Sequence, residues 1–126
     1  MIASKTFLIG IVGPCGAGKS TLTEALAAQG YATRHIAQEH SYVKDMWQRL
    51  TNPDLLIFLQ ASFPVTRQRK SGMQFWKEAD YNEQQRRLAH ALEHADLVID
   101  TDTLTINEVL AKVTTFLEER LEGGSA

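Results

Sequence analysis

Two stretches of the chain are almost continuously apolar and too short to be long helices. Residues 6–12 read Thr-Phe-Leu-Ile-Gly-Ile-Val, and residues 55–59 read Leu-Leu-Ile-Phe-Leu. An unbroken apolar run of this length is typical of a parallel strand covered on both faces. Residues 97–99 form a shorter apolar run, and residues 31–37 are a weaker candidate of mixed polarity. The pattern therefore predicts about four strands.

Helical spacing fills the segments between these strands. Residues 19–29 place their apolar side chains on one face and stop at Gly30, a residue that favours helix ends. A short helix is expected over residues 42–50, before the turn-like Asn-Pro-Asp at 52–54. Pro64 is well placed in the first turn of a further, basic helix.

The second half of the chain carries two longer helical patterns. The first runs over residues 82–95, with Gln85, Leu88, Leu92 and Ala95 at helical spacing and Asn82 with Gln85 as a capping pair. The second follows the turn at 101–103. There, Thr105 and Glu108 make a capping box ahead of apolar positions from Ile106 to Leu117.

Alternation of strands and helices predicts a three-layer α/β fold with a small, mainly parallel sheet. The length of 126 residues suits one domain. We expect that domain to cover residues 1–122 and residues 123–126 to be a flexible tail.

Composition narrows the classes of partner. The formal net charge of -2 offers no overall attraction for nucleic acid. The apolar run near the N-terminus is too short for a membrane span and leads into glycines rather than a cleavage site. One cysteine, Cys15, cannot form an internal disulfide, so a reducing, cytoplasmic location is expected.

A glycine-rich loop between the first strand and the first helix carries the strongest chemical signal. Residues 13–20 read Gly-Pro-Cys-Gly-Ala-Gly-Lys-Ser, the Walker A pattern. Such a loop wraps a triphosphate with backbone N–H groups at a helix N-terminus, where the helix dipole favours negative charge. The predicted nucleotide-binding residues here are Gly13, Pro14, Cys15, Gly16, Ala17, Gly18, Lys19, Ser20 and Thr21.

Within this loop, individual side chains have distinct expected roles. Lys19 would reach the β- and γ-phosphates, and the Ser20 hydroxyl would bind Mg²⁺. Cys15 is interpreted as a small loop residue rather than a nucleophile. The competing interpretation is a glycine-rich turn that binds nothing.

Several segments together resemble the small-molecule and nucleoside monophosphate kinases among P-loop proteins. The segments are Pro-Asp-Leu-Leu-Ile-Phe-Leu-Gln-Ala-Ser at 53–62, Arg-Gln-Arg at 67–69 and Ala-Asp-Leu-Val-Ile-Asp at 95–100. An Asn-Lys-x-Asp guanine signature and the signature helix of transporter ATPases are both missing from the sequence. The resemblance covers most of the chain and implies a P-loop NTPase fold that uses ATP and Mg²⁺.

The resemblance also implies roles for residues outside the glycine loop. Arginines of a mobile lid cover the transferred phosphoryl group in such kinases, and the loop after the last strand touches adenine. The residues that match the lid are Arg67, Arg69, Lys70 and Arg86 or Arg87, and those that match the adenine loop are Thr101, Asp102 and Thr103. The alternative is that these cations are solvated helix residues. Trp76 and Tyr81 are expected to pack rather than to cover a base.

This sequence departs from the kinase pattern in two places. Residues 31–55 leave room for only one strand and a short helix, so the acceptor region is reduced. The apolar run at 55–59 ends at Gln60, where a Walker B acid is expected. Glu39 is the best substitute, as a magnesium ligand or a base, against the alternative of a surface acid. Asp100 also ends an apolar run, but the resemblance to the kinases places it in the last strand, away from the metal.

Two functions follow from these patterns. The first is an ATP-dependent kinase that transfers the γ-phosphoryl group to a small acceptor, with Lys19, Arg67, Arg69 and Glu39 as catalytic residues. The second is a nucleotide-binding regulatory module or slow ATPase. The four histidines are not at metal-ligand spacing. The sequence leaves the acceptor and the oligomeric state open.

Overall fold

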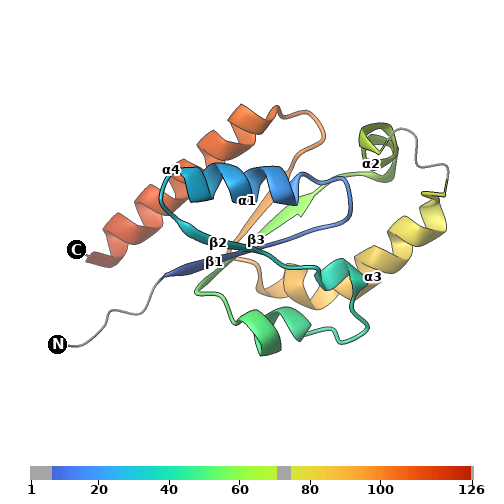
Figure 1. The fold of residues 1–126 in the computed structure, drawn as a ribbon, viewed down its shortest axis with the longest axis horizontal. Coiled ribbons are helices and arrows are strands. Elements are labelled where there is room, and N and C mark those ends of the chain that lie inside the picture. The colour runs from blue at the N-terminus through green and yellow to red at the C-terminus, as the bar shows by residue number, and fades with distance from the viewer. Residues whose placement is uncertain (1–6, 71–74, 126) are drawn as a thin grey trace.

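A parallel sheet of four strands forms the centre of the protein (Figure 1). The computed structural model describes residues 7–70 and 75–125. The strands lie in the order β2-β1-β3-β4, so β1 and β3 are central. Their bounds are Leu8–Val12 for β1, Ala32–His35 for β2, Leu55–Gln60 for β3 and Leu97–Asp100 for β4. The predicted α/β class with four strands is confirmed.

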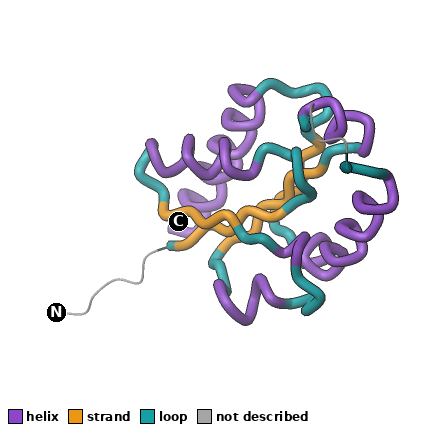
Figure 2. The backbone as a smooth tube through the Cα atoms, turned by 45° about the vertical axis from the view of Figure 1, so that its right-hand side comes forward, coloured by secondary structure: helices purple, strands orange, loops and turns teal. Residues whose placement is uncertain are grey.

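Helices cover both faces of the sheet and make three layers (Figure 2). Helices α1 (Lys19–Ala28) and α4 (Ile106–Ser125) lie on one face, and α3 (Glu78–His94) lies on the other. Strand β3 divides between the two cores because successive side chains of a strand point to opposite faces. Leu55, Ile57 and Leu59 join the core under α1 and α4, while Leu56 and Phe58 join the core under α3.

Parallel pairing aligns the carboxyl ends of the strands at one edge of the sheet. Val12 of β1 is in register with Phe58 of β3, and Gln60 of β3 is in register with Asp100 of β4. The loops that leave these strands therefore meet at the same edge. In open α/β sheets this edge is the usual place for a ligand site.

The helix predicted over 82–95 begins earlier than expected, at Glu78. Its cap is the Lys77–Asp80 pair, in which the Asp80 carboxylate accepts the Lys77 backbone N–H at 3.1 Å. The buried face is formed by Gln84, Leu88 and Ala91, whereas the predicted face residue Leu92 is 39% exposed. The Asn82–Gln85 pair lies inside the helix, because the Asp80 carboxylate caps the helix closer to the preceding loop.

The segment after β2 differs from the expected short helix over 42–50. It forms a 3₁₀ turn, η1 (Gln38–His40), and a later turn of π-helix, η2 (Trp47–Thr51). The second turn ends where Asn52 adopts a positive φ of 46°. The Trp47 side chain of this turn is buried and packs in the core under α3. The backbone here is therefore set by the burial of one large aromatic side chain, and a regular α-helix does not form over 42–50.

Other boundaries agree with the sequence patterns. Helix α2 (Phe63–Arg69) has Pro64 in its first turn. The Thr105–Glu108 capping box is confirmed, with Glu108 Oε1 accepting the Thr105 N–H at 2.9 Å and Thr105 Oγ1 accepting the Glu108 N–H at 3.2 Å. Thr6 and Ala126 lie outside the described residues, and the flexibility expected of residues 123–126 stays a prediction.

Within residues 7–70 and 75–125, no helix is both long enough and apolar enough to span a bilayer.

Replacing Leu117 by alanine should destabilise the protein strongly. Leu117 is fully buried between α4 and the sheet, and truncation there leaves a cavity. The expected loss is about 2–5 kcal/mol of unfolding free energy, measured by urea denaturation. Leu121→Ala in the same helix is the matched control, because Leu121 is 39% exposed. Equal losses for the two variants would contradict the assigned position of α4.

Candidate functional site

The glycine loop, residues 13–20, joins β1 to α1 at the carboxyl edge of the sheet. Gly13, Gly16 and Gly18 adopt φ values of 154°, 85° and 98°, which residues with a Cβ rarely adopt. At Gly13 a Cβ would also collide with the backbone oxygen of Leu59 on the neighbouring strand. Gly18 directly precedes α1, so the loop ends at the positive end of a ten-residue helix.

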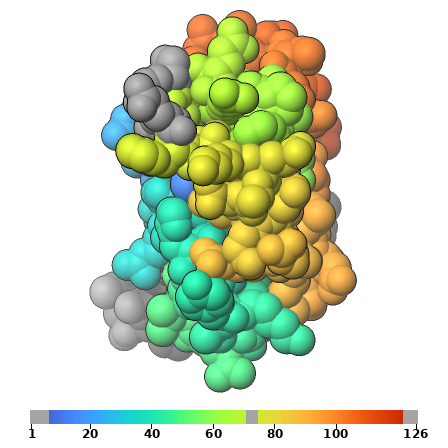
Figure 3. Space-filling model, turned by 90° about the vertical axis from the view of Figure 1, so that its right-hand side faces the viewer, coloured from blue at the N-terminus to red at the C-terminus, as the bar shows by residue number. Residues whose placement is uncertain are grey.

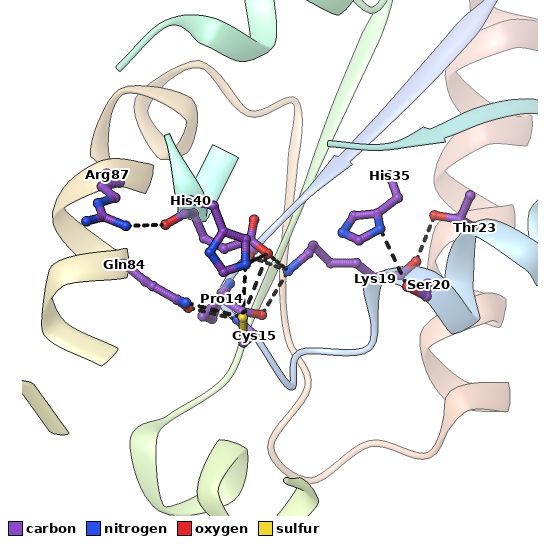
Figure 4. A network of polar contacts seen from close by, with 11 residues as sticks. Pro14, Cys15, Lys19, Ser20, Thr23, His35, His40, Gln84 and Arg87 are labelled. Carbon is purple, nitrogen blue, oxygen red and sulfur yellow. Dashed lines mark hydrogen bonds and ion pairs between the residues drawn. The ribbon is translucent and has the colours of Figure 1, made fainter. Parts of the chain in front are cut away.

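Lys19 is the charged centre of this loop and is only 5% exposed. Its Nζ donates to the carbonyl oxygens of Gly13 at 2.6 Å and Pro14 at 3.1 Å. It also forms an ion pair with Glu39 Oε2 at 2.8 Å (Figure 4). The acid comes from the turn that follows β2, which pairs with β1. A buried cation is therefore neutralised by a buried anion from the adjacent strand connection.

Gln38 fixes the turn that carries Glu39. Its side chain is fully buried, donates to the carbonyl oxygens of Val43 and Arg87, and accepts the Trp47 N–H at 2.9 Å. Arg87 of α3 in turn donates to the Glu39 carbonyl oxygen at 3.3 Å. These bonds hold η1 between the loop and α3. Among described residues, Glu39 Oε1 is buried and accepts no hydrogen bond.

Helix α3 also contacts the glycine loop directly. Gln84 Oε1 accepts the Cys15 backbone N–H at 3.0 Å, and Gln84 Nε2 donates to the Cys15 sulfur at 3.2 Å. In Figure 4 the Gln84 side chain points from α3 toward Cys15. The sulfur lies 3.6 Å from His40 Nε2. Cys15 is thus held by α3 on one side and approached by η1 on the other.

The first turn of α1 presents hydroxyl groups to solvent. Ser20 and Thr21 are exposed, and Ser20 Oγ lies 3.5 Å from His35 Nδ1 at the end of β2. Burial, and then the positive charges of Lys19 and His40, lower the pKa of His35, against an opposing effect of Glu39. The lowered pKa favours the neutral form of the His35 ring beside Ser20.

Arg69 of α2 reaches across the carboxyl edge to β4. Its guanidinium donates to the carbonyl oxygens of Gly16 at 3.1 Å and Thr101 at 2.6 Å, and to Thr101 Oγ1 at 2.9 Å. Arg67 is exposed, as Arg69 is, but unlike Arg69 it makes no hydrogen bond or ion pair with another described residue. The two arginines of the predicted lid therefore occupy different environments.

The loop after β4 is tied to the start of α2. Asp102 Oδ1 accepts the Ser62 N–H at 2.8 Å, whereas Thr103 is exposed. Tyr81 of α3 donates its hydroxyl to the Ala61 carbonyl oxygen at 2.6 Å. Burial, followed by the negative charges of Asp102 and Asp100, raises the pKa of Tyr81. This hydroxyl consequently stays protonated and structural.

Helices α2 and α3 lie next to each other on the face shown in Figure 3. The Phe63 and Tyr81 rings have centroids 5.9 Å apart, and Trp76 Nε1 donates to Thr66 Oγ1 at 3.0 Å. Trp76 is buried and Tyr81 half-buried, so both pack as the sequence predicted. Arg86 and Arg87 pair with Glu83 at 2.8 Å and 3.6 Å.

Two hollows adjoin the glycine loop and share Gly18 and Thr21. One, of about 190 Å³, is lined mainly by apolar side chains together with Arg69 and Thr101. The apolar residues are Ala17, Leu59, Leu104, Ile106 and Val109. The other, of about 290 Å³, is lined by polar groups that include Lys19, Ser20, His35, Glu39, His40 and Lys70. An apolar and a charged hollow thus lie next to each other along one loop.

The structure brings most of the predicted site residues together, and it adds others. Lys19, Ser20 and Glu39 surround the charged hollow, and Arg69 and Thr101 the apolar one. Gln38 and Gln84 carry no motif, so their roles in holding Glu39 and Cys15 were not predicted. At the end of β3, Gln60 exchanges hydrogen bonds with Gln85 at 3.3 and 3.0 Å.

Comparison with known proteins bears on the fold alone. A scan against family models and a search of curated proteins each found no match. Among solved structures, the chain is similar to the YorR protein from Bacillus subtilis in complex with phosphorylated GDP. The two share 14% sequence identity at a TM-score of 0.69, over 91% of this chain and 98% of that one. The likeness supports the three-layer α/β fold.

Neutralising Glu39 should destabilise the nucleotide-free protein. Glu39→Gln leaves Lys19 buried without its counter-charge, although the two carbonyl contacts remain. Breaking a buried pair in this way costs about 3 kcal/mol. Urea denaturation measures the loss. Glu83→Gln, at a half-exposed ion pair on α3, is the control and should change stability little. Two equally stable variants would argue against a strong Lys19–Glu39 interaction.

Proposed function

We propose that the protein binds a nucleoside triphosphate with Mg²⁺ and transfers its γ-phosphoryl group to a small acceptor. The observation that carries this proposal is the pairing of two hollows along the glycine loop. The apolar hollow suits a purine ring, and the charged hollow suits phosphates. Because both include Gly18 and Thr21, one extended nucleotide fits across them.

The phosphate half of this site rests on backbone and side-chain charge. The loop ends at the start of α1, where free N–H groups and the helix dipole favour an anion. Lys19 already points to the loop carbonyls of Gly13 and Pro14. A bound triphosphate would give Lys19 a new partner and release Glu39. Ser20 and Glu39 would then hold Mg²⁺, Glu39 either directly or through water.

The base half rests on Arg69 and the loop after β4. Arg69 joins Gly16 to Thr101, so it closes one wall of the apolar hollow. Thr101, Asp102 and Thr103 remain the proposed contacts to adenine. YorR, which has a similar fold, was crystallised with phosphorylated GDP, and this supports a nucleotide as the ligand. Which purine is preferred is a question for competition binding.

A second function has an observation of its own. Gln60 stands where β3 ends beside β1, and it bonds Gln85 rather than offering a carboxylate to a metal. This arrangement favours slow hydrolysis, as in a regulatory module whose bound nucleotide controls a partner. The two functions differ in whether an acceptor stimulates turnover.

The deciding experiment measures ADP formation from ATP and Mg²⁺ with purified protein. Nucleosides, nucleoside monophosphates, sugars and coenzyme precursors are offered in turn, with a no-acceptor control. A kinase forms ADP together with a phosphorylated acceptor in equal amounts. Slow ADP formation that no acceptor accelerates would instead support the regulatory module.

Lys19→Ala should weaken ATP·Mg²⁺ binding by about tenfold or more, because a charge-assisted contact to the phosphates is lost. Isothermal titration calorimetry measures the affinity, and circular dichroism verifies the fold. Lys44→Ala, on the exposed segment before η2, is the matched control. Unchanged affinity in a folded Lys19→Ala protein would refute the proposed phosphate site.

Arg67→Ala should lower kcat and kcat/KM together while ATP affinity stays close to wild type. A lid arginine acts on charge that develops during transfer, and its loss costs about 10³-fold in rate. Arg69→Ala should also weaken nucleotide binding, because Arg69 lines the apolar hollow. Arg49→Ala, an exposed arginine paired with Asp45, is the control. Full activity of Arg67→Ala would remove that residue from the catalytic set.

A further inference from the structure

Three potential metal ligands from two separate segments meet beside the glycine loop. They are the Cys15 thiol, the Glu39 carboxylate and the His40 imidazole. The Cys15 sulfur lies 4.0 Å from Glu39 Oε2 and 3.6 Å from His40 Nε2, and the two η1 atoms are 3.8 Å apart. Twenty-four or more residues separate Cys15 from the other two in sequence, so the fold alone creates this cluster.

These separations fit a small cation. The circle through the three atoms has a radius of about 2.2 Å, which lies within the range of zinc–ligand bonds. In a tetrahedral zinc site, sulfur, nitrogen and oxygen ligands stand about 3.3–3.6 Å apart. If the distances between the three ligand atoms shorten by a few tenths of an ångström, these atoms occupy three of the four coordination positions of a tetrahedral zinc ion. The fourth position stays open.

The chemistry of the three donors selects the metal. Thiolate and imidazole are ligands for zinc and similar soft divalent ions, whereas Mg²⁺ requires oxygen donors. Gln84 Nε2 donates to the Cys15 sulfur at 3.2 Å, and such an outer hydrogen bond stabilises a metal-bound thiolate. The cluster borders the charged hollow, and His40 is 60% exposed, so an ion has a path of entry.

A second observation independently points to a ligand. Glu39 is only 2% exposed, and within the described part of the chain its Oε1 atom lacks a hydrogen-bond partner. A buried carboxylate oxygen without a partner is costly. A cation bound through Glu39 Oε2 would neutralise the charge of this carboxylate, whose other oxygen has no partner among the described residues.

We propose that Cys15, Glu39 and His40 form a binding site for Zn²⁺ at the edge of the glycine loop. On binding, the thiol proton passes to solvent and sulfur, carboxylate oxygen and imidazole nitrogen bind the metal. The ion shares Glu39 Oε2 with Lys19, whose ammonium lies 2.8 Å away. Because the metal and the Lys19 ammonium repel each other, Lys19 keeps only its hydrogen bonds to the Gly13 and Pro14 carbonyls. The metal thus occupies the carboxylate that a bound nucleotide needs released.

Metal binding to nucleotide-free, untagged protein tests this site directly. Zinc is titrated by calorimetry against the intact chain, and Co²⁺ is used as a spectroscopic substitute. We expect one Zn²⁺ per chain and a thiolate-to-cobalt charge-transfer absorption. Cys15→Ser should abolish that absorption, and His40→Ala should weaken zinc binding by at least about 100-fold, because each removes one of three metal bonds. His94→Ala, an exposed histidine of α3, should bind like wild type.

Removing Lys19 distinguishes this site from a chance pair of surface ligands. Lys19→Met should bind zinc at least about tenfold more tightly, because the repelling ammonium is gone. No cobalt–thiolate absorption in wild type, or wild-type zinc affinity in His40→Ala, would overturn the proposal. Since no nucleotide is present, either result leaves the proposed kinase activity untouched, and failure of that activity leaves the zinc result standing.

Discussion

The buried ion pair between Lys19 and Glu39 is the interaction around which the carboxyl edge of the sheet is arranged. Both side chains are removed from water, so each charge needs its partner to offset a large desolvation cost. Keeping Glu39 in reach requires η1 to be rigid, which the fully buried Gln38 side chain provides. Keeping Lys19 in reach requires the glycine loop to close tightly over β1. Burial and several polar contacts therefore fix both charged side chains in place.

Lys19 has two kinds of partner in the structure, and the proposed function adds a third. Loop carbonyls and a carboxylate hold it in the nucleotide-free protein. In the proposed function, phosphates replace the carboxylate, and Glu39 becomes available to a metal or to an acceptor hydroxyl. The proposed zinc site uses the same carboxylate together with Cys15 and His40. The two proposed sites would thus share one acid, and the residues around that acid are held by hydrogen bonds from Gln84 and Arg87 of helix α3.

Local patterns were sufficient wherever a short segment carried its own signal. The apolar run at 55–59 predicted β3, whose side chains are buried on both faces. Thr105 and Glu108 predicted the start of α4, because a capping box involves only neighbouring residues. The start of α3 was wrong because Asn82 and Gln85 have the residue types of a cap, while Lys77 and Asp80 formed the actual one. Residues 42–50 do not form a regular helix, because the burial of Trp47 determines the backbone conformation there.

The sequence by itself determined the α/β class, the glycine loop and the expectation that Glu39 lies near phosphates, since each follows from spacing within one strand connection. Tertiary structure alone decided which side chains meet. Cys15 and His40 have no metal-ligand spacing along the chain, yet they lie 3.6 Å apart because β2 pairs with β1 and delivers η1 onto the loop. Likewise, only the folded chain distinguishes Arg69, which donates from α2 to Thr101, from Arg67, which makes no hydrogen bond or ion pair with the described residues. Residues far apart in sequence become neighbours through parallel pairing, and the order of the strands is set by how the whole chain buries its apolar faces.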